Sequence, residues 1–238
     1  MELEEFKKFF EEQLSQNNIN IEIEMEEFYI YMKNILEWNE KINVTNIKEE
    51  KEFIIKHFID SLTISKYIEN NSRVLDIGTG GGFPGIPLKL SNKTIKGTLI
   101  DSVNKKIIVV NDGIEKLKLE KIEAIHTRAE DLAIRKDYRE GFDIVVTRAV
   151  SNLSTIVEYM LPFLKIGGKA ICMKGPNYEE ELEEAKKAIN VLGGTLQEIN
   201  KIKISEEFER NIIIIKKEKI TPKQYPRGNG KPLRNPIK

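Results

Sequence analysis

The feature that most constrains this chain is a glycine-rich turn that follows a short apolar segment. Residues 73–85 read Arg-Val-Leu-Asp-Ile-Gly-Thr-Gly-Gly-Gly-Phe-Pro-Gly, with four glycines in the five positions 78–82. Glycine adopts positive φ angles and lets the backbone approach a ligand without a Cβ in the way. Pro84 suits the first turn of a helix. A buried strand, a glycine turn and a helix in this order are typical of a doubly wound α/β fold that binds a ligand at the turn.

Beyond residue 73, segments with strand and helix patterns alternate. Short, β-branched and nearly continuous apolar strands flanked by helices indicate a parallel sheet covered on both faces. The last two apolar runs are separated by a short polar turn, which predicts an antiparallel hairpin at the end of a mostly parallel sheet. The expected strands are residues 73–77, 98–101, 122–127, 142–147, 169–174, 195–204 and 211–217, and the expected helices are residues 84–90, 103–117, 153–164 and 179–192.

Three helical segments precede the first strand. Apolar residues recur three and four positions apart in residues 3–14 and 25–42, and a third helix is expected over residues 49–67, with Thr45 or Asn46 near its start as capping candidates. The chain becomes polar and proline-rich after residue 217, which predicts little regular structure. We therefore expect an N-terminal helical layer at 1–70, a ligand-binding domain at 71–218 and a basic tail at 219–238.

Composition excludes several classes of protein. The single cysteine, Cys172, rules out an intramolecular disulfide framework and any cysteine-based zinc cluster, and we expect no metal. The N-terminus is acidic where a signal peptide needs basic residues, and no apolar run approaches the ~20 residues of a transmembrane helix. We therefore expect a cytoplasmic protein without a membrane partner. Residues 1–60 hold 7 Lys/Arg against 15 Asp/Glu, whereas residues 216–238 hold 8 against 1, which predicts a basic interaction tail.

The turn departs from the dinucleotide-binding pattern at one position. Phe83 stands where dehydrogenases carry a third glycine, and its bulk would obstruct a pyrophosphate at the helix N-terminus. S-adenosylmethionine has no phosphate, and Asp76 supplies negative charge suited to its cationic methionine portion. Asp101, 21 residues after Gly80, stands where an acidic residue is expected to accept hydrogen bonds from ribose hydroxyls. We therefore predict a Rossmann-like class I methyltransferase sheet that binds S-adenosylmethionine at Gly78 and Gly80; a dehydrogenase is the competing interpretation.

Two further segments follow strands at the edge where doubly wound folds place their ligands. Ala129 and Glu130 are expected beside the adenine, as backbone and carboxylate partners of its exocyclic amine. Alternatively they form the acidic first turn of a helix. Arg148 is our only candidate for catalysis, as a positioning residue, and the alternative there is a surface salt bridge.

Two catalytic features that other methyltransferases use are missing from the sequence, and their absence narrows the choice of methyl acceptor. Methylation of a pyrimidine carbon requires a cysteine thiolate, and Cys172 lies in an apolar strand where we expect an inert thiol. Methylation of an exocyclic amine usually accompanies an Asn/Asp-Pro-Pro-aromatic motif, whereas residues 147–152 read Thr-Arg-Ala-Val-Ser-Asn. Guanine N7 needs neither device, so the sequence is compatible with that acceptor without establishing it. His57 is a possible general base, but its position one turn from Phe53 favours a packing or hydrogen-bonding role.

These residues resemble the bacterial ribosomal RNA small subunit methyltransferase G family, also called GidB. The most diagnostic segments are Gly-Phe-Pro-Gly-Ile-Pro at 82–87 and Thr-Arg-Ala-Val at 147–150. The resemblance covers almost the whole chain and is carried by residues 38–45, 57–62, 76–87, 101–102, 128–130, 142–150, 174–175 and 226–233.

The resemblance implies methyl transfer from S-adenosylmethionine to N7 of a guanine in 16S ribosomal RNA, either naked or within the small ribosomal subunit. It also implies that Gly78, Phe83, Ala129, Glu130 and Arg148 contact the cofactor. A methyltransferase acting on another RNA or on a small molecule is the alternative.

The basic tail is expected to bind RNA. Its basic side chains would neutralise RNA phosphates, so that binding weakens steeply with salt; a solvated, disordered terminus is the alternative. We expect RNA to be recognised through an unstacked base or a loop, because side chains cannot read the deep groove of an A-form helix. The expected phosphate contacts are Lys223, Arg227, Lys231 and Arg234.

Overall fold

The computed structural model describes residues 1–148 and 151–237, and a seven-stranded sheet runs through this part of the chain. Its strand order is β3-β2-β1-β4-β5-β7-β6, with β1 to β5 parallel and β7 antiparallel to both of its neighbours. The mostly parallel sheet with a C-terminal hairpin is thereby confirmed. The strands are β1 Arg73–Ile77, β2 Lys96–Asp101, β3 Ile122–His126, β4 Phe142–Arg148, β5 Leu164–Lys174, β6 Gly194–Lys203 and β7 Glu209–Lys217.

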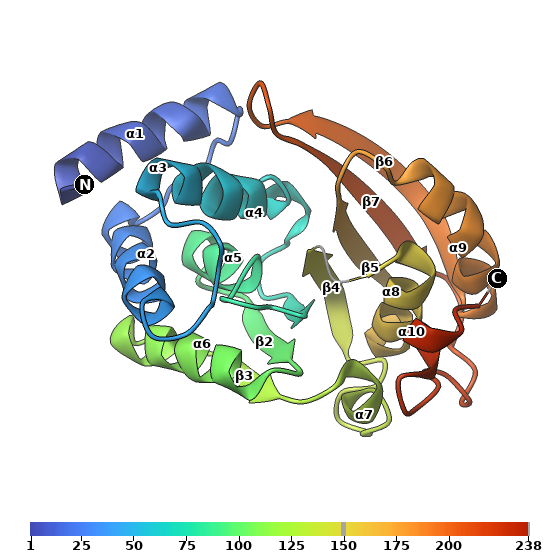
Figure 1. Cartoon of the computed structure of the whole chain (residues 1–238). Helices are drawn as coiled ribbons and strands as arrows, with labels where there is room; N and C mark the ends of the chain where they lie inside the picture. Colours follow the sequence, from blue (N-terminus) through green and yellow to red (C-terminus); the bar gives the residue numbers. More distant parts are fainter. Residues whose placement is uncertain (149–150, 238) are drawn as a thin grey trace.

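Helices cover both faces of this sheet (Figure 1). A π-helical segment, Ile54–Ile59, joins α3 to α4, and short 3-10 turns lie at Ser65–Tyr67 and Leu161–Phe163. Among the described residues, none of the helices is both long and apolar enough to cross a membrane. The α-helices are α1 Leu3–Gln16, α2 Met25–Asn39, α3 Glu50–Phe53, α4 Asp60–Leu62, α5 Gly85–Ser91, α6 Asn104–Lys116, α7 Ala129–Leu132, α8 Leu153–Met160, α9 Glu179–Val191 and α10 Lys231–Arg234.

Several boundaries differ from the sequence-based expectation. The third helical segment is capped by Glu49, whose carboxylate accepts a hydrogen bond from the Glu52 amide at 2.7 Å, so neither Thr45 nor Asn46 has this role. The helix expected over residues 153–164 ends at Met160 and continues as a 3-10 turn that contains Pro162. Proline lacks the amide proton that a continuing α-helix needs.

The N-terminal helices and the sheet share one hydrophobic core. Phe28 and Tyr31 of α2 belong to the same buried cluster as Phe83 in the glycine turn, Leu99 of β2 and Val110 of α6. In Figure 1 the helices α1 to α4 lie on the side of the sheet that carries α5 and α6. The helical layer therefore packs directly against the glycine turn.

The C-terminal tail has little regular structure, as expected, because α10 is its one helix among the described residues, but hydrogen bonds and an ion pair fix it to the rest of the protein. The Arg139 guanidinium donates to the carbonyl oxygens of Thr221 at 2.9 Å and Tyr225 at 2.8 Å. Arg227 pairs with Glu158, whose side chain is fully buried in α8. Figure 1 shows the tail, in red, lying beside α8. A buried carboxylate needs a charged or hydrogen-bonding partner, and here the tail provides it.

Candidate functional site

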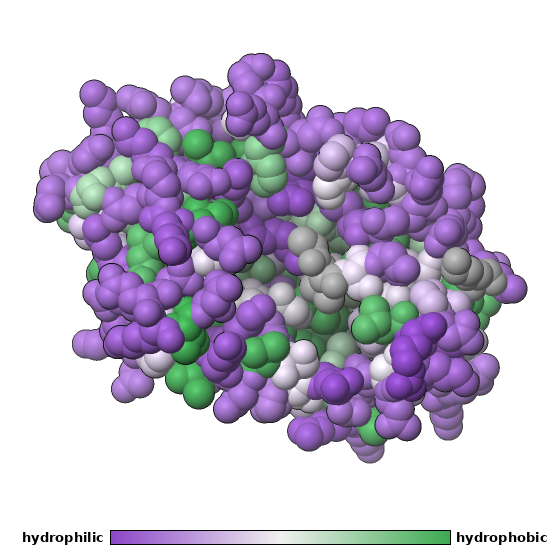
Figure 2. Space-filling model, in the orientation of Figure 1, coloured by the Kyte–Doolittle hydropathy of each residue, from purple (hydrophilic) through white to green (hydrophobic). Residues whose placement is uncertain are grey.

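A cavity of about 810 Å³ opens at the carboxyl ends of β1, β2 and β4, which is within the size range of small-molecule sites. Figure 2 shows this face of the molecule hollowed near its centre, with apolar side chains inside a largely hydrophilic rim. Asp76 lies outside the cavity lining. The sequence-predicted residues that line the cavity are Gly78, Gly80, Phe83, Asp101, Ala129, Glu130 and Arg148.

The glycine turn takes a backbone shape that other residues rarely adopt. Gly78, Gly80 and Gly82 have φ angles of 72°, 59° and 86°, and a Cβ at Gly82 would overlap the Tyr31 hydroxyl. That hydroxyl donates to the Gly81 carbonyl at 2.9 Å. The amides of Gly78 and Thr79 both donate to a carbonyl near the end of β2, at 2.9 and 3.0 Å. The turn is therefore held between β2 and the N-terminal helical layer.

Asp76 stabilises the turn through hydrogen bonds from outside the cavity lining. Its Oδ2 accepts hydrogen bonds from the Thr79 hydroxyl at 2.7 Å and the Gly85 amide at 2.9 Å. Within the described part of the chain its buried Oδ1 has no hydrogen-bond partner. Burial raises the pKa of Asp76 to about 6. The structure thus gives Asp76 a role in shaping the turn, and its direct contact with a cofactor stays a prediction.

Asp101 joins the tips of two strands. Its Oδ2 accepts from the Gly80 amide at 3.0 Å, and its Oδ1 accepts from the Val103 amide at 2.8 Å. Each carboxylate oxygen has further acceptor capacity, so hydroxyl groups of a ligand can also donate to Asp101. The structure therefore places this carboxylate beside the glycine turn, at the edge of the cavity.

The segment after β3 forms the acidic first turn of a helix, one of the two interpretations made from the sequence, and its contact with an adenine stays a prediction. Ala129 and Glu130 form the first turn of α7, and both also line the cavity. The Glu130 side chain is 5% exposed, and its Oε1 accepts from the Gly230 amide at 3.1 Å. The tail is therefore bonded directly to this side of the cavity.

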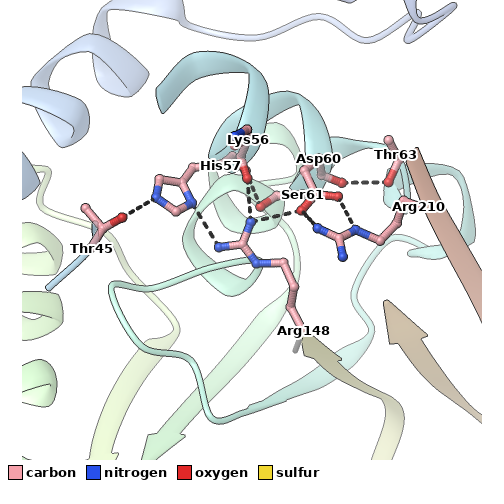
Figure 3. A network of polar contacts seen from close by, with 8 residues as sticks. All are labelled: Thr45, Lys56, His57, Asp60, Ser61, Thr63, Arg148 and Arg210. Carbon is pink, nitrogen blue, oxygen red and sulfur yellow. Dashed lines mark hydrogen bonds and ion pairs between the residues drawn. The ribbon is translucent and has the colours of Figure 1, made fainter. Parts of the chain in front are cut away.

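Beside the turn, where the Arg148 guanidinium lies 5.4 Å from the Phe83 ring centroid, a carboxylate lies between two arginines (Figure 3). Asp60 is fully buried; its Oδ2 accepts from Arg148 at 3.0 Å, and both its oxygens accept from Arg210, at 2.8 and 2.7 Å. The Arg148 side chain is only 13% exposed, so its ion pair with Asp60 is not a surface salt bridge. Two guanidinium groups and one carboxylate leave a net charge of +1, and both arginines line the cavity. This charge suits an anionic ligand group.

His57 is held as a neutral hydrogen-bonding residue. Arg148 donates to its Nδ1 at 3.0 Å, so the ring proton is on Nε2, which lies 2.9 Å from the Thr45 hydroxyl (Figure 3). The imidazole stacks on Phe83 with 4.3 Å between ring centroids. Burial, followed by the Arg148 charge, lowers the pKa of His57 to about 3. The expected packing and hydrogen-bonding role is therefore confirmed.

Cys172 lies in the core of the sheet. It is fully buried, its Sγ lies 3.5 Å from the Met160 sulfur, and burial raises its pKa to about 12. A thiol with this pKa is protonated at neutral pH and is a poor nucleophile. The expectation of an inert core thiol is confirmed.

The basic residues of the tail do not share one environment. Lys223, Lys231 and Arg234 are exposed. Arg227 instead donates through Nε and its terminal nitrogen to Glu158, at 2.9 and 2.6 Å. The structure assigns Arg227 a different role from the expected phosphate contact, because its charge is compensated by a buried carboxylate.

Sequence reasoning missed several residues of this site. Asp60 and Arg210 are 150 positions apart, and no local pattern pairs them. Leu233 and Gly230 line the cavity from a tail that was expected to be irregular. The one available signal was the spacing of His57 and Asp60, which lies within a family-like segment and places both on one side of a helix. Ala149, in the segment that follows Arg148, lies outside the described residues.

Comparison with known proteins decides the family. The family model described as rRNA small subunit methyltransferase G, GidB, matches residues 24–213. The chain belongs to this family. A ribosomal RNA small subunit methyltransferase G from Alkaliphilus oremlandii is 46% identical over 226 residues, which cover 92% of this chain and 95% of the relative. The protein of the same name from Desulforamulus reducens is 48% identical over 213 residues, which cover 88% and 89%.

Solved structures share the fold at low identity. A magnesium protoporphyrin IX methyltransferase from Synechocystis, with bound S-adenosylmethionine, covers 79% of this chain and 97% of its own at a TM-score of 0.58 and 11% identity. The YcgJ protein from Bacillus subtilis covers 68% and 100% at a TM-score of 0.52 and 15% identity. This likeness confirms the class I methyltransferase fold.

S-adenosylmethionine is the cofactor of a methyltransferase of this family and fold, and the cavity fits it. The glycine turn exposes backbone where no Cβ intervenes, and Asp101 offers a carboxylate to sugar hydroxyls. The net positive charge of Asp60, Arg148 and Arg210 suits the carboxylate of the methionine portion.

Proposed function

We propose that this chain transfers the methyl group of S-adenosylmethionine to N7 of a guanine in the 16S ribosomal RNA of the small subunit. The cofactor would supply the methyl group on a sulfonium, whose sulfur leaves as a neutral thioether. The residues of the chain therefore have to align the acceptor and exclude water. One observation carries the proposal: in a chain of an rRNA methyltransferase family, the same cavity is lined by the glycine turn, by Asp101 beside it and by the positively charged pair Arg148 and Arg210.

The choice of guanine N7 is supported by the chemistry around the cavity. The only thiol, Cys172, is buried in the core with a raised pKa, so it cannot activate a pyrimidine ring. His57 is neutral, and both of its ring nitrogens are within hydrogen-bonding distance of other side chains. Guanine N7 has an available lone pair and requires no general base, so an acceptor of this kind matches the residues present.

Positive charge supports an RNA substrate. Lys56 and Arg128 line the cavity, while Lys223, Lys231 and Arg234 are exposed on the tail. We infer that these tail side chains contact RNA phosphates, so that affinity falls steeply as salt is raised. The same substrate supports a cytoplasmic location for the protein.

The test is nucleoside analysis. Small-subunit RNA from cells that lack the gene is incubated with the protein and S-adenosylmethionine, digested, and examined by mass spectrometry. The expected product is one additional 7-methylguanosine per RNA. A different methylated nucleoside would contradict the guanine N7 assignment, and no methylation of either naked RNA or assembled subunits would contradict the substrate.

A further inference from the structure

The C-terminal tail is mounted on one face of α8. The buried Glu158 accepts hydrogen bonds from three groups of Arg227: from the amide at 2.8 Å, from Nε at 2.9 and 3.2 Å and from the terminal nitrogen at 2.6 Å. Thr155 donates to the Pro232 carbonyl at 3.1 Å. Thr155 and Glu158 are three positions apart and therefore lie on the same side of the helix. The tail is thus fixed to α8 on both sides of Gly230.

Because the tail is fixed to α8, two of its residues lie at the cavity. Gly230 and Leu233 belong to the cavity lining together with Tyr159, which follows Glu158 in the chain. The Gly230 amide donates to Glu130 at 3.1 Å, and its φ angle of 65° is one that favours glycine. The Leu233 side chain is 61% exposed and presents an apolar surface at the cavity edge.

We propose that Gly230 and Leu233 form part of the cofactor site and bound the end that receives the adenine. Ala129 and Glu130 are the residues expected to face the adenine, and Glu130 is bonded to Gly230, so the tail lies at that end of the cavity. An apolar side chain is stabilised when a planar base covers it. This inference rests on the proposed placement of S-adenosylmethionine in this cavity, and it assigns the tail a function beyond RNA binding.

The primary test compares two exposed apolar residues of the same tail. Leu233 lines the cavity, whereas Ile220, which is 65% exposed, lies outside the lining. Calorimetric titration of the full-length variants measures their affinity for S-adenosylmethionine and for adenosine. Leu233→Ala is expected to lower the affinity for both ligands about tenfold, as the loss of roughly half the burial of a leucine side chain predicts. Ile220→Ala is expected to bind both as the wild type does.

A second pair tests the backbone of the tail. Gly230→Ala places a side chain at a positive φ angle, whereas a Cβ at Gly228 meets no atom within 4 Å. Because strain at Gly230 disturbs its bond to Glu130, we expect Gly230→Ala to bind the cofactor about threefold more weakly, and Gly228→Ala to bind it normally. Melting temperatures of all four variants report whether each one is folded.

The outcomes separate this inference from the proposed function. If Leu233→Ala binds cofactor like the wild type and only its KM for RNA rises, the tail is an RNA contact and the inference is wrong. If Leu233→Ala loses cofactor affinity while the wild type methylates no ribosomal RNA, the proposed substrate is wrong and the inference holds. A wild type that binds no S-adenosylmethionine would overturn both.

Discussion

Two walls of the cavity are built in different ways. The glycine wall is the turn at residues 78–82 together with Asp101. It joins residues close in sequence, because Gly80 and Asp101 are 21 positions apart, and most of its hydrogen bonds involve backbone groups. The charged wall joins Asp60 to Arg148 and Arg210, which are 88 and 150 positions away, through side chains alone. A substitution in the glycine wall should therefore weaken cofactor binding and leave the fold intact. A substitution in the charged wall should lower the stability of the fold itself.

The largest expected effect is on the charged wall. Asp60→Ala leaves two guanidinium groups without their buried carboxylate, which is expected to lower the free energy of unfolding by about 3–5 kcal/mol. Urea denaturation measures this change. Glu183→Gln is the control, because it breaks an ion pair with Lys186 in which both side chains are more than half exposed, and it should cost less than about 1 kcal/mol. An equal effect of the two variants would contradict the contrast between the walls.

The next effect is on the glycine wall. Asp101→Ala removes the acceptor for the Gly80 amide and the acceptor that we propose for the ribose, so the affinity for S-adenosylmethionine should fall about 100-fold, as the loss of hydrogen bonds to a charged group predicts. Calorimetric titration measures it. Asp101→Asn keeps an acceptor oxygen and should lose less. Unchanged affinity in a folded Asp101→Ala protein would remove the ribose assignment.

A smaller effect is expected on the pH dependence of stability, to which His57 contributes beside the charged wall. Its folded pKa of about 3 lies below the ordinary value of 6.5, so between these pH values the unfolded chain binds more protons and stability falls as pH falls. At pH 5.5 this linkage lowers the free energy of unfolding by about 1.4 kcal/mol relative to pH 8.

The buried Asp76, with its raised pKa, acts in the opposite direction, so the informative quantity is the difference between wild type and His57→Gln. Urea denaturation at a series of pH values should give the wild type a steeper loss of stability on acidification than His57→Gln. Parallel curves for the two proteins would mean that His57 titrates normally in the folded state.

The smallest effect on activity is expected at Cys172, which belongs to neither wall. Cys172→Ser should methylate RNA at the wild-type rate, because the thiol lies outside the cavity lining and is protonated. A hydroxyl in an apolar core should lower stability by about 1–3 kcal/mol, so the rate is compared at a temperature where both proteins are folded. Loss of activity in the folded variant would reopen a covalent mechanism.

Most of the glycine wall could be predicted from the sequence, because its causes are local. Four glycines after a strand and an acid at the end of the next strand specify both the turn and its partner. β2 and β5 begin earlier than expected, at Lys96 and Leu164. Lysine and glycine at their starts, as in Lys165-Ile-Gly-Gly, interrupt the apolar pattern by which strands are recognised.

The charged wall and the tail could not be predicted, because their partners are distant in sequence. Arg227 stands in a polar, proline-rich segment, which favoured an RNA contact. Its actual partner, Glu158, is the only acidic residue in an otherwise largely apolar helix. A lone carboxylate on an apolar helix indicates that a cation is needed nearby, but it does not indicate which cation.

The central claim is that S-adenosylmethionine lies across the tips of β1 and β2 with its ribose at Asp101 and its adenine toward the tail. A crystal structure of the complex tests it most directly. We predict ribose hydroxyls within about 3 Å of the Asp101 carboxylate and the adenine between Ala129 and Leu233. A cofactor bound elsewhere, or with its sugar turned away from Asp101, would contradict the account.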